Sequence, residues 1–178
     1  GLPVMLPHGR GSVFYDDHNR NKRAITLELN QEEGRQVAYD LLRHSDVFLS
    51  NFRPKVLARM GLDYPSLRQV NKRLVYASAS GLGREGPDAD RPSIAFVVDA
   101  RSGMMMAGGE QGQDPCMVPV GVGDRITSVF LAYGIMSALL QREKTGEGQE
   151  LHVSQLMAMM TLFGNTMSSY LWLGQPVP

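Results

Sequence analysis

Two arginines stand beside a predicted helix start, where their charges can meet an anionic ligand. Arg53 and Arg59 are six residues apart, which lets both reach one phosphate cluster. Phosphates are bound by Arg or Lys side chains and by free backbone N–H groups. Phe52 offers an aromatic face to a base, and Asn51 offers amide hydrogen bonds. The alternative is that both arginines are solvated helix charges and that Phe52 belongs to the core.

A short glycine-containing turn, Ser80-Gly81-Leu82-Gly83, follows a predicted strand. Glycine lets the backbone approach a ligand closely because it has no Cβ. The turn is not a P-loop, since no Gly-Lys-Ser/Thr follows it. It indicates a ligand-facing loop, with an ordinary strand-to-loop turn as the alternative.

Other chemistry-bearing side chains form no recognisable site in the sequence. The histidines are His8, His18, His44 and His152. They are scattered and lack metal-ligand spacing, so we expect no metal site. Cys116 has no histidine near it in the sequence, which leaves a catalytic thiol unsupported. Asp124 is interpreted as the N-cap of a long helix.

The composition limits the class of partner. Eighteen Lys and Arg residues balance eighteen Asp and Glu residues, so no overall field favours nucleic acid or an anionic membrane. The single cysteine excludes an internal disulfide and fits a reducing, cytoplasmic location. A chain of 178 residues is long enough for one sizeable globular domain with its own core.

Strands that alternate with helices must position these residues. Predicted strands, each a short apolar or alternating run, lie at residues 25–29, 46–50, 74–78 and 150–153. Predicted helices are one capped by Asn30 and those at residues 54–60, 64–70, 94–107, 124–144 and 154–173. Residues 1–23 are predicted to be irregular. The alternation predicts an open, mainly parallel, Rossmann-like α/β sheet flanked by helices.

In such a sheet, ligands bind at the carboxyl ends of the strands. Residues 51–54 and 80–83 each follow a predicted strand, so we expect both loops to face the same ligand. Residues 156–173 carry no charge and approach the length of a membrane span. Polar residues interrupt this segment and no basic flank sets an orientation, which favours a helix in a protein core or a subunit contact.

Several short motifs follow one another in order along nearly the whole chain. They are Asn19-Arg20-Asn21-Lys22-Arg23-Ala24-Ile25-Thr26-Leu27, Asn51-Phe52-Arg53-Pro54, Arg59-Met60-Gly61-Leu62, Leu74-Val75-Tyr76-Ala77, Ser80-Gly81-Leu82-Gly83, Gly86-Pro87, Arg91-Pro92, Ala100, Ser102-Gly103-Met104, Gly123-Asp124, Ala138-Leu139, Arg142, Thr145-Gly146, Gly148-Gln149 and Val153-Ser154. In order and spacing they resemble the family III CoA-transferases of the CaiB/BaiF type. The resemblance implies that residues 1–178 are part of the large, CoA-binding domain of such a protein.

The resemblance also implies which residues contact coenzyme A or an acyl-CoA as substrate. Residues that match family contacts, or that lie in the two strand-end loops, are Leu27, Asn51, Phe52, Arg53, Arg59, Met60, Ser80 and Gly81. Leu27 would lie near the adenine. The family often has a lysine three residues later, where this chain has Asn30, so one expected charge contact is missing.

Family members use an aspartate near the start of the active-site helix to attack the thioester carbonyl. It lies seven residues before the serine of a Ser-Gly pair, and counting back from Ser102 gives Ala95. A methyl group cannot act as a nucleophile or a base. Asp99 is a candidate surrogate, but one helical turn displaces it by about 5 Å. Catalytic geometry tolerates much less than that, so a structural hydrogen bond is the favoured role of Asp99.

Three functions are compatible with these residues. The first is transfer of CoA from a thioester to a carboxylic acid. The second is a non-catalytic, CoA-thioester-binding pseudoenzyme, and the third is an alpha-methylacyl-CoA racemase-like protein. The racemase subgroup also uses an aspartate at the position of Ala95, which counts against it.

Family members are usually much longer than this chain. The resemblance therefore implies a first nucleotide-binding segment before residue 1 and a small domain after residue 178. Intact members form interlocked homodimers. The expected partners are an acyl-CoA, a carboxylic acid and a second copy of the protein, with no nucleic acid and no membrane.

Overall fold

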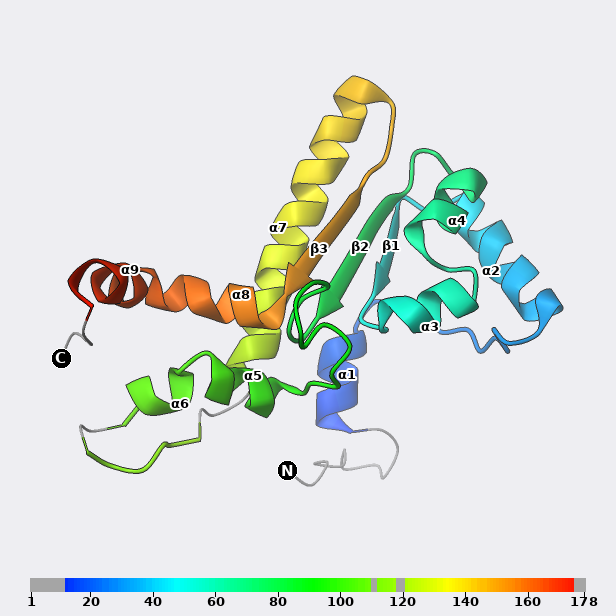
Figure 1. Cartoon of the computed structure of the whole chain (residues 1–178). Helices are drawn as coiled ribbons and strands as arrows, with labels where there is room; N and C mark the ends of the chain where they lie inside the picture. Colours follow the sequence, from blue (N-terminus) through cyan, green and yellow to red (C-terminus); the bar gives the residue numbers. More distant parts are fainter. Residues whose placement is uncertain (1–11, 110–111, 118–120, 175–178) are drawn as a thin grey trace.

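The fold is built on a small parallel sheet (Figure 1). The computed structural model describes residues 12–109, 112–117 and 121–174. Its three strands are hydrogen-bonded in the order β1 (Val47–Ser50), β2 (Val75–Ser80) and β3 (Glu150–Ser154). All pairs are parallel, so each connection crosses over through helices. The open, parallel α/β sheet flanked by helices is confirmed.

The described helices all lie outside the sheet. They are α1 (Val13–Asn19), α2 (Glu32–Arg43), α3 (Pro54–Arg59), α4 (Tyr64–Val70), α5 (Ala95–Arg101), α6 (Met104–Ala107), α7 (Val122–Thr145), α8 (Gln155–Met160), the 3-10 turn η1 (Thr161–Phe163) and α9 (Gly164–Leu173). Local signals set several bounds. Pro54 is the first residue of α3, where its missing N–H costs nothing, and Gly61 follows the helix with a φ of 69° that suits glycine.

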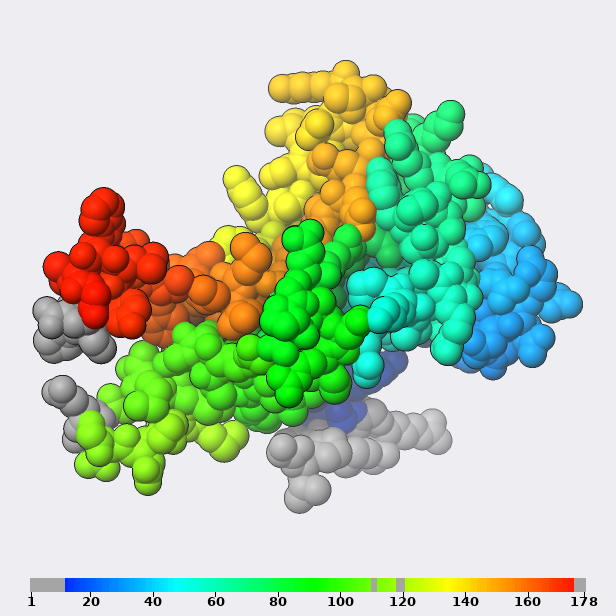
Figure 2. Space-filling view, in the orientation of Figure 1, coloured from blue at the N-terminus to red at the C-terminus, as the bar shows by residue number. Residues whose placement is uncertain are grey.

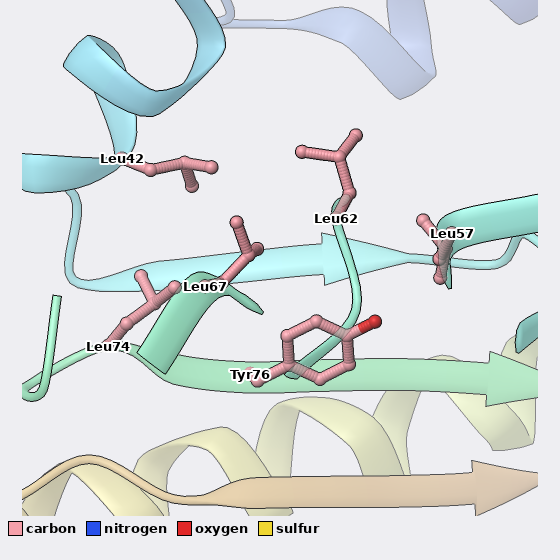
Figure 3. Packing of buried hydrophobic residues seen from close by; sticks show 6 residues of the cluster. All are labelled: Leu42, Leu57, Leu62, Leu67, Leu74 and Tyr76. Atoms are coloured by element: carbon pink, nitrogen blue, oxygen red, sulfur yellow. The ribbon is translucent and has the colours of Figure 1, made fainter. Parts of the chain in front are cut away.

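A hydrophobic core lies between one face of the sheet and α2, α3 and α4. Figure 3 shows its buried members, which are Leu42, Leu57, Leu62, Leu67, Leu74 and Tyr76. The Tyr76 ring centroid lies 5.2 Å from that of Phe48 and 5.7 Å from that of Tyr64. Because successive side chains of a strand point to opposite faces, this packing directs every second side chain of β2 into the core.

The long helix α7 packs against β2 and β3 on the other face. Arg142, which is 8% exposed, anchors its C-terminal end to the start of the sheet. The guanidinium donates to Asp46 Oδ1 at 2.8 Å and to the Arg73 carbonyl at 3.1 Å. The chain then turns closely back to β3, since a Cβ on Gly148 would lie 2.1 Å from the Leu74 carbonyl oxygen.

The predicted strand at residues 25–29 is wrong. This segment is irregular and pairs with none of the three strands, and Ile25 is 63% exposed. Alternation alone does not make a strand where no partner supplies the ladder. The predicted cap by Asn30 is wrong as well, because Asn30 donates to the Glu28 carboxylate and Gln31 occupies the N-cap of α2.

Two helix predictions, and the prediction for the leading segment, differ from the structure in detail. The helix at 94–107 is divided by Gly103, which has a φ of 85°. Asp124 does not cap α7, because the helix begins at Val122 after Gly121. In the leading segment, α1 forms where irregular structure was expected, with Ser12 Oγ accepting from the Tyr15 N–H at 3.1 Å. Residues 1–11 lie outside the described residues.

The last predicted helix is divided into α8, η1 and α9. In α8, Ala158 and Met159 are buried. By contrast α9 projects from the body of the molecule, as Figure 2 shows in red, and Trp172 is 89% exposed. The prediction of a helix in a protein core or a subunit contact is met by a core position for α8, and for α9 the subunit contact stays a prediction. Within the described ranges, no helix combines the length and apolar character that crossing a membrane requires.

Candidate functional site

A cavity of about 810 Å³ opens at the carboxyl ends of β1 and β2. Asn51 and Phe52, from the loop after β1, line one part of its wall. Ser80 and Gly81, from the end of β2 and the loop that follows, line another. Ala95, the first residue of α5, lies on the same cavity. Both loops and position 95 thus surround one space.

Helices far away in sequence complete the wall. The residues they supply are Asp124, Thr127, Ser128, Leu131 and Gln155. Gln155 Nε2 donates to the Asp124 carboxylate, which joins the start of α8 to the first turn of α7. Sequence reasoning did not assign these residues to a site, because apolar and polar positions on a helix give no signal of a cavity.

Four of the predicted contact residues do not lie in this wall. Leu27 is partly buried and does not line the cavity, whereas Leu29, two residues later, does. Arg53 and Arg59 are exposed at the two ends of α3. Met60 is partly buried and packs against the hydrophobic core. A ligand that touched them would extend out of the cavity and over α3.

Gly81 allows a close approach between two segments of the site. A Cβ at this position would lie 2.3 Å from Ser93 Cβ, so only glycine fits without a shift. The Leu156 N–H donates to the Gly81 carbonyl at 2.9 Å and holds the other side of the loop. Figure 2 shows the segment after β2, in green, packed between α3 and α8. Ser93 also lines the cavity, and its buried Oγ has no hydrogen-bond partner among the described residues.

Asp99 is not brought to the cavity. It is fully buried, on the side of α5 that packs against α7 and α8. Its Oδ1 lies at the first turn of α7, 3.1 Å from where a Cβ on Gly123 would stand. Burial raises the pKa of this carboxyl, and the nearby Gly123 backbone N–H counteracts part of that effect. Both carboxylate oxygens are buried with no hydrogen-bond partner among the described residues, so the structural hydrogen bond expected of Asp99 is not found, and Asp99 is not among the residues that line the cavity.

A hydrogen-bonded histidine lies at the end of the sheet, next to the cavity. His152 on β3 is partly buried between two serines of β2. Its Nε2 lies 3.0 Å from Ser80 Oγ and its Nδ1 lies 3.1 Å from Ser78 Oγ. Arg84 Nη2 donates to Ser78 Oγ at 2.5 Å, and the same guanidinium pairs with Glu150. These residues border a second cavity of about 300 Å³, and Ser80 lines both cavities.

Burial and charge shift the proton affinity of this group. Burial, with the Arg84 charge as the next cause, lowers the pKa of His152 to about 4, although Glu150 acts in the opposite direction. The imidazole is therefore neutral at physiological pH. Burial likewise raises the pKa of Tyr76, which lines the second cavity, to about 12.

Sequence reasoning missed His152. The serines that hold it are 72 and 74 residues away along the chain, and only the pairing of β2 with β3 brings them together. No cluster of three or more His, Cys, Asp or Glu side chains that could hold a metal ion occurs in the described part of the chain.

The chain is similar in sequence to a known protein family and to characterised relatives. The profile of CoA-transferase family III matches residues 3–178. A Fusarium pseudograminearum protein named acyl-CoA transferase is 37% identical over 92% of this chain. The acetyl-CoA:oxalate CoA-transferase of Acetobacter aceti is 41% identical over 82% of it. The chain spans only 36% and 38% of the lengths of these two relatives.

The fold is similar to that of solved structures. A CaiB/BaiF family protein from Brucella suis superposes with a TM-score of 0.90 and 32% sequence identity. The similarity covers 98% of this chain and 46% of that structure. The match therefore extends to the arrangement of strands and helices around the cavity, in less than half of the larger protein.

Proposed function

Because this chain belongs to CoA-transferase family III, we propose that its cavity binds the CoA portion of an acyl-CoA, and that the whole protein transfers CoA from a thioester to a carboxylic acid. The observation that carries the proposal is the shared cavity of the loops after β1 and β2. Asn51 and Ser80 line this cavity, together with Ala95 at the start of α5. A volume of about 810 Å³ suits a ligand of this size.

Each predicted contact has a chemical role in this proposal. Asn51 hydrogen-bonds the ligand, and Phe52, which is 51% exposed, stacks against the adenine. Arg53 and Arg59, exposed on α3, bind the phosphates where the ligand leaves the cavity. Gly81, which lines the cavity, lets Ser93 pack against the loop beside the pantetheine arm. Leu27 and Met60 contribute apolar contacts at the outer part of the ligand.

The reactive end of the ligand meets Ala95 in this proposal. A methyl group cannot form the acyl anhydride through which an aspartate would transfer CoA. Asp99 is buried on another side of α5 and we assign it a structural role. This favours a second candidate function, a CoA-thioester-binding protein without carboxylate-dependent transfer. The homodimer and the cytoplasmic location expected from the family resemblance belong to the same proposal.

Calorimetric titration with CoA tests the binding site. Phe52→Ala and Arg59→Ala should each weaken binding about tenfold, because each removes a stacking face or a charged hydrogen bond worth about 1–3 kcal/mol. Arg43→Ala is the matched control, since Arg43 lies on α2 and pairs with Asp40. Unchanged affinity in both site variants would remove α3 and its loop from the site.

Ala95→Asp tests the catalytic part of the proposal. The variant restores a carboxylate at the start of α5, facing the cavity. With acetyl-CoA and oxalate as substrates, we expect an acyl adduct on the new aspartate and transfer of CoA that exceeds the level in the unmodified protein. A variant that binds CoA but forms no adduct would show that position 95 does not face the thioester.

A further inference from the structure

The hydroxyl of Ser80 differs in its hydrogen bonds from the other hydroxyls of the large cavity, the one of about 810 Å³. Ser80 is the last residue of β2 and lines the cavity beside Gly81. Its Oγ accepts from the Gly83 N–H at 3.0 Å and lies 3.0 Å from His152 Nε2. Among the described residues of the cavity wall, it is the one hydroxyl that is hydrogen-bonded to an imidazole.

The surrounding hydrogen bonds are compatible with a Ser80 hydroxyl that donates to His152 Nε2. Ser80 Oγ already accepts from Gly83, and the acceptor within reach of its own proton is His152 Nε2. The other ring nitrogen, Nδ1, then carries the proton and donates to Ser78 Oγ. Ser78 Oγ has two acceptor sites, and the Arg84 guanidinium, which can only donate, occupies the second. In this tautomer Nε2 of His152 can take a proton from Ser80.

A second hydroxyl lies where it can assist. Ser93 Oγ is buried and has no partner among the described residues, and it would lie 2.5 Å from a Cβ on Gly81. It lines the same cavity as Ser80. A free hydroxyl beside Gly81, the residue that follows Ser80, can donate to a carbonyl oxygen that gains negative charge.

We propose that Ser80 and His152 form a nucleophile–base pair that hydrolyses the thioester of an acyl-CoA bound in the large cavity. The inference rests on the proposed function, in that the cavity must hold an acyl-CoA. It adds an activity that does not use position 95.

The steps balance without a further reactant except water. Ser80 Oγ attacks the thioester carbonyl carbon while its proton passes to His152 Nε2. The C–S bond then breaks, and His152 returns the proton to the thiolate, which leaves as CoA. An acyl ester remains on Ser80. Water attacks this ester with His152 as the base, the C–Oγ bond breaks, and the carboxylic acid leaves as Ser80 regains its proton.

The low pKa of His152 has two consequences for the rate. The imidazole is in its proton-accepting form throughout the neutral range, so its protonation does not limit the reaction above about pH 5. A base whose pKa lies well below the working pH has less driving force for proton removal, so turnover should be slow. Arg84 contributes to this weakness, because its positive charge opposes an imidazolium at His152.

The experiment is to incubate the protein with acetyl-CoA in the absence of any other carboxylic acid. Free CoA and acetate are measured by chromatography, which avoids interference from the free thiol of Cys116. After an acid quench, peptide mass analysis locates the acetyl group. The variants are Ser80→Ala, Ser80→Cys and His152→Gln. His44→Gln and Ser45→Ala, at the end of α2, are the matched controls, and CoA affinity is titrated for every variant.

We expect release of CoA and acetate, an acetyl ester on Ser80, and a loss of at least about 100-fold in both Ser80→Ala and His152→Gln. Ser80→Cys should retain an acetyl adduct at residue 80, which a merely structural serine would not predict. Unchanged release in Ser80→Ala, or an adduct on another residue, overturns the inference. CoA binding without release overturns it while leaving the proposed function intact, and absence of CoA binding overturns both.

Discussion

Replacing His152 with glutamine should make the fold less sensitive to acid. In the folded chain the pKa of His152 is lowered to about 4, from an ordinary value of 6.5. Between these values the unfolded chain binds a proton that the folded chain does not, so stability falls as the pH is lowered from about 6.5 towards 4. Above pH 6.5 both states are neutral and the contribution is constant.

The magnitude follows from the two pKa values. At pH 5 the difference in proton binding corresponds to a loss of about 2 kcal/mol relative to pH 7.5. His152 is only partly buried, and water screens part of the effect, so we expect about 1 kcal/mol. Arg84 and Glu150 act on the charge of the imidazole, and Tyr76 and Asp63 line the same cavity. They remain in place in the variant.

Urea unfolding at pH 7.5 and pH 5, followed by the helical circular dichroism signal, measures the effect. Trp172 is 89% exposed and is a poor reporter of unfolding. The quantity of interest is the difference between unmodified protein and His152→Gln at the two pH values. This difference cancels the contribution of Asp99, whose raised pKa acts in the opposite direction. If both proteins lose the same stability between pH 7.5 and 5, the reasoning about His152 is refuted.

Two further predictions concern packing. Gly148→Ala should destabilise the fold by about 3 kcal/mol, because its Cβ would lie 2.1 Å from the Leu74 carbonyl oxygen. The Cβ of Gly164→Ala would meet no atom within 4 Å, so this control should change stability by less than about 1 kcal/mol. Arg142→Met should lower the free energy of unfolding by about 2–3 kcal/mol, because it removes the hydrogen bonds of an arginine that is only 8% exposed. Arg43→Met breaks an exposed ion pair and should lower it by less than about 1 kcal/mol. Chemical denaturation of the four variants measures both differences, and equal losses within either pair would contradict the packing described.

Local signals in the sequence predicted the elements that depend on local chemistry. Pro54 and Gly61 mark the two ends of α3, and the apolar runs of β1 and β2 were found because both strands are short and bounded by polar residues. The segment at 25–29 has the same alternation as a strand but lacks a partner strand. Pairing is a property of the whole sheet, so the pattern alone could not decide that case.

The candidate site was predictable only where its residues follow strands. Asn51 and Ser80 were found because ligands gather at the carboxyl ends of parallel strands. His152 was not found, since its hydrogen bonds to Ser78 and Ser80 depend on the register of β2 with β3. Nor does the sequence show that Asp99 is buried away from the cavity. Helical spacing places Asp99 near Ala95, but it does not tell on which side of α5 the helix α7 packs.

Hydrogen exchange of backbone amides with and without CoA tests the position of the site most directly. If CoA binds in the cavity at the ends of β1 and β2, exchange should slow in residues 49–52, 79–82 and 93–95. Segments remote from it, such as the C-terminal half of α7, should be unaffected. Protection of those remote segments alone, or no protection at CoA concentrations that saturate binding, would contradict a CoA site in this cavity.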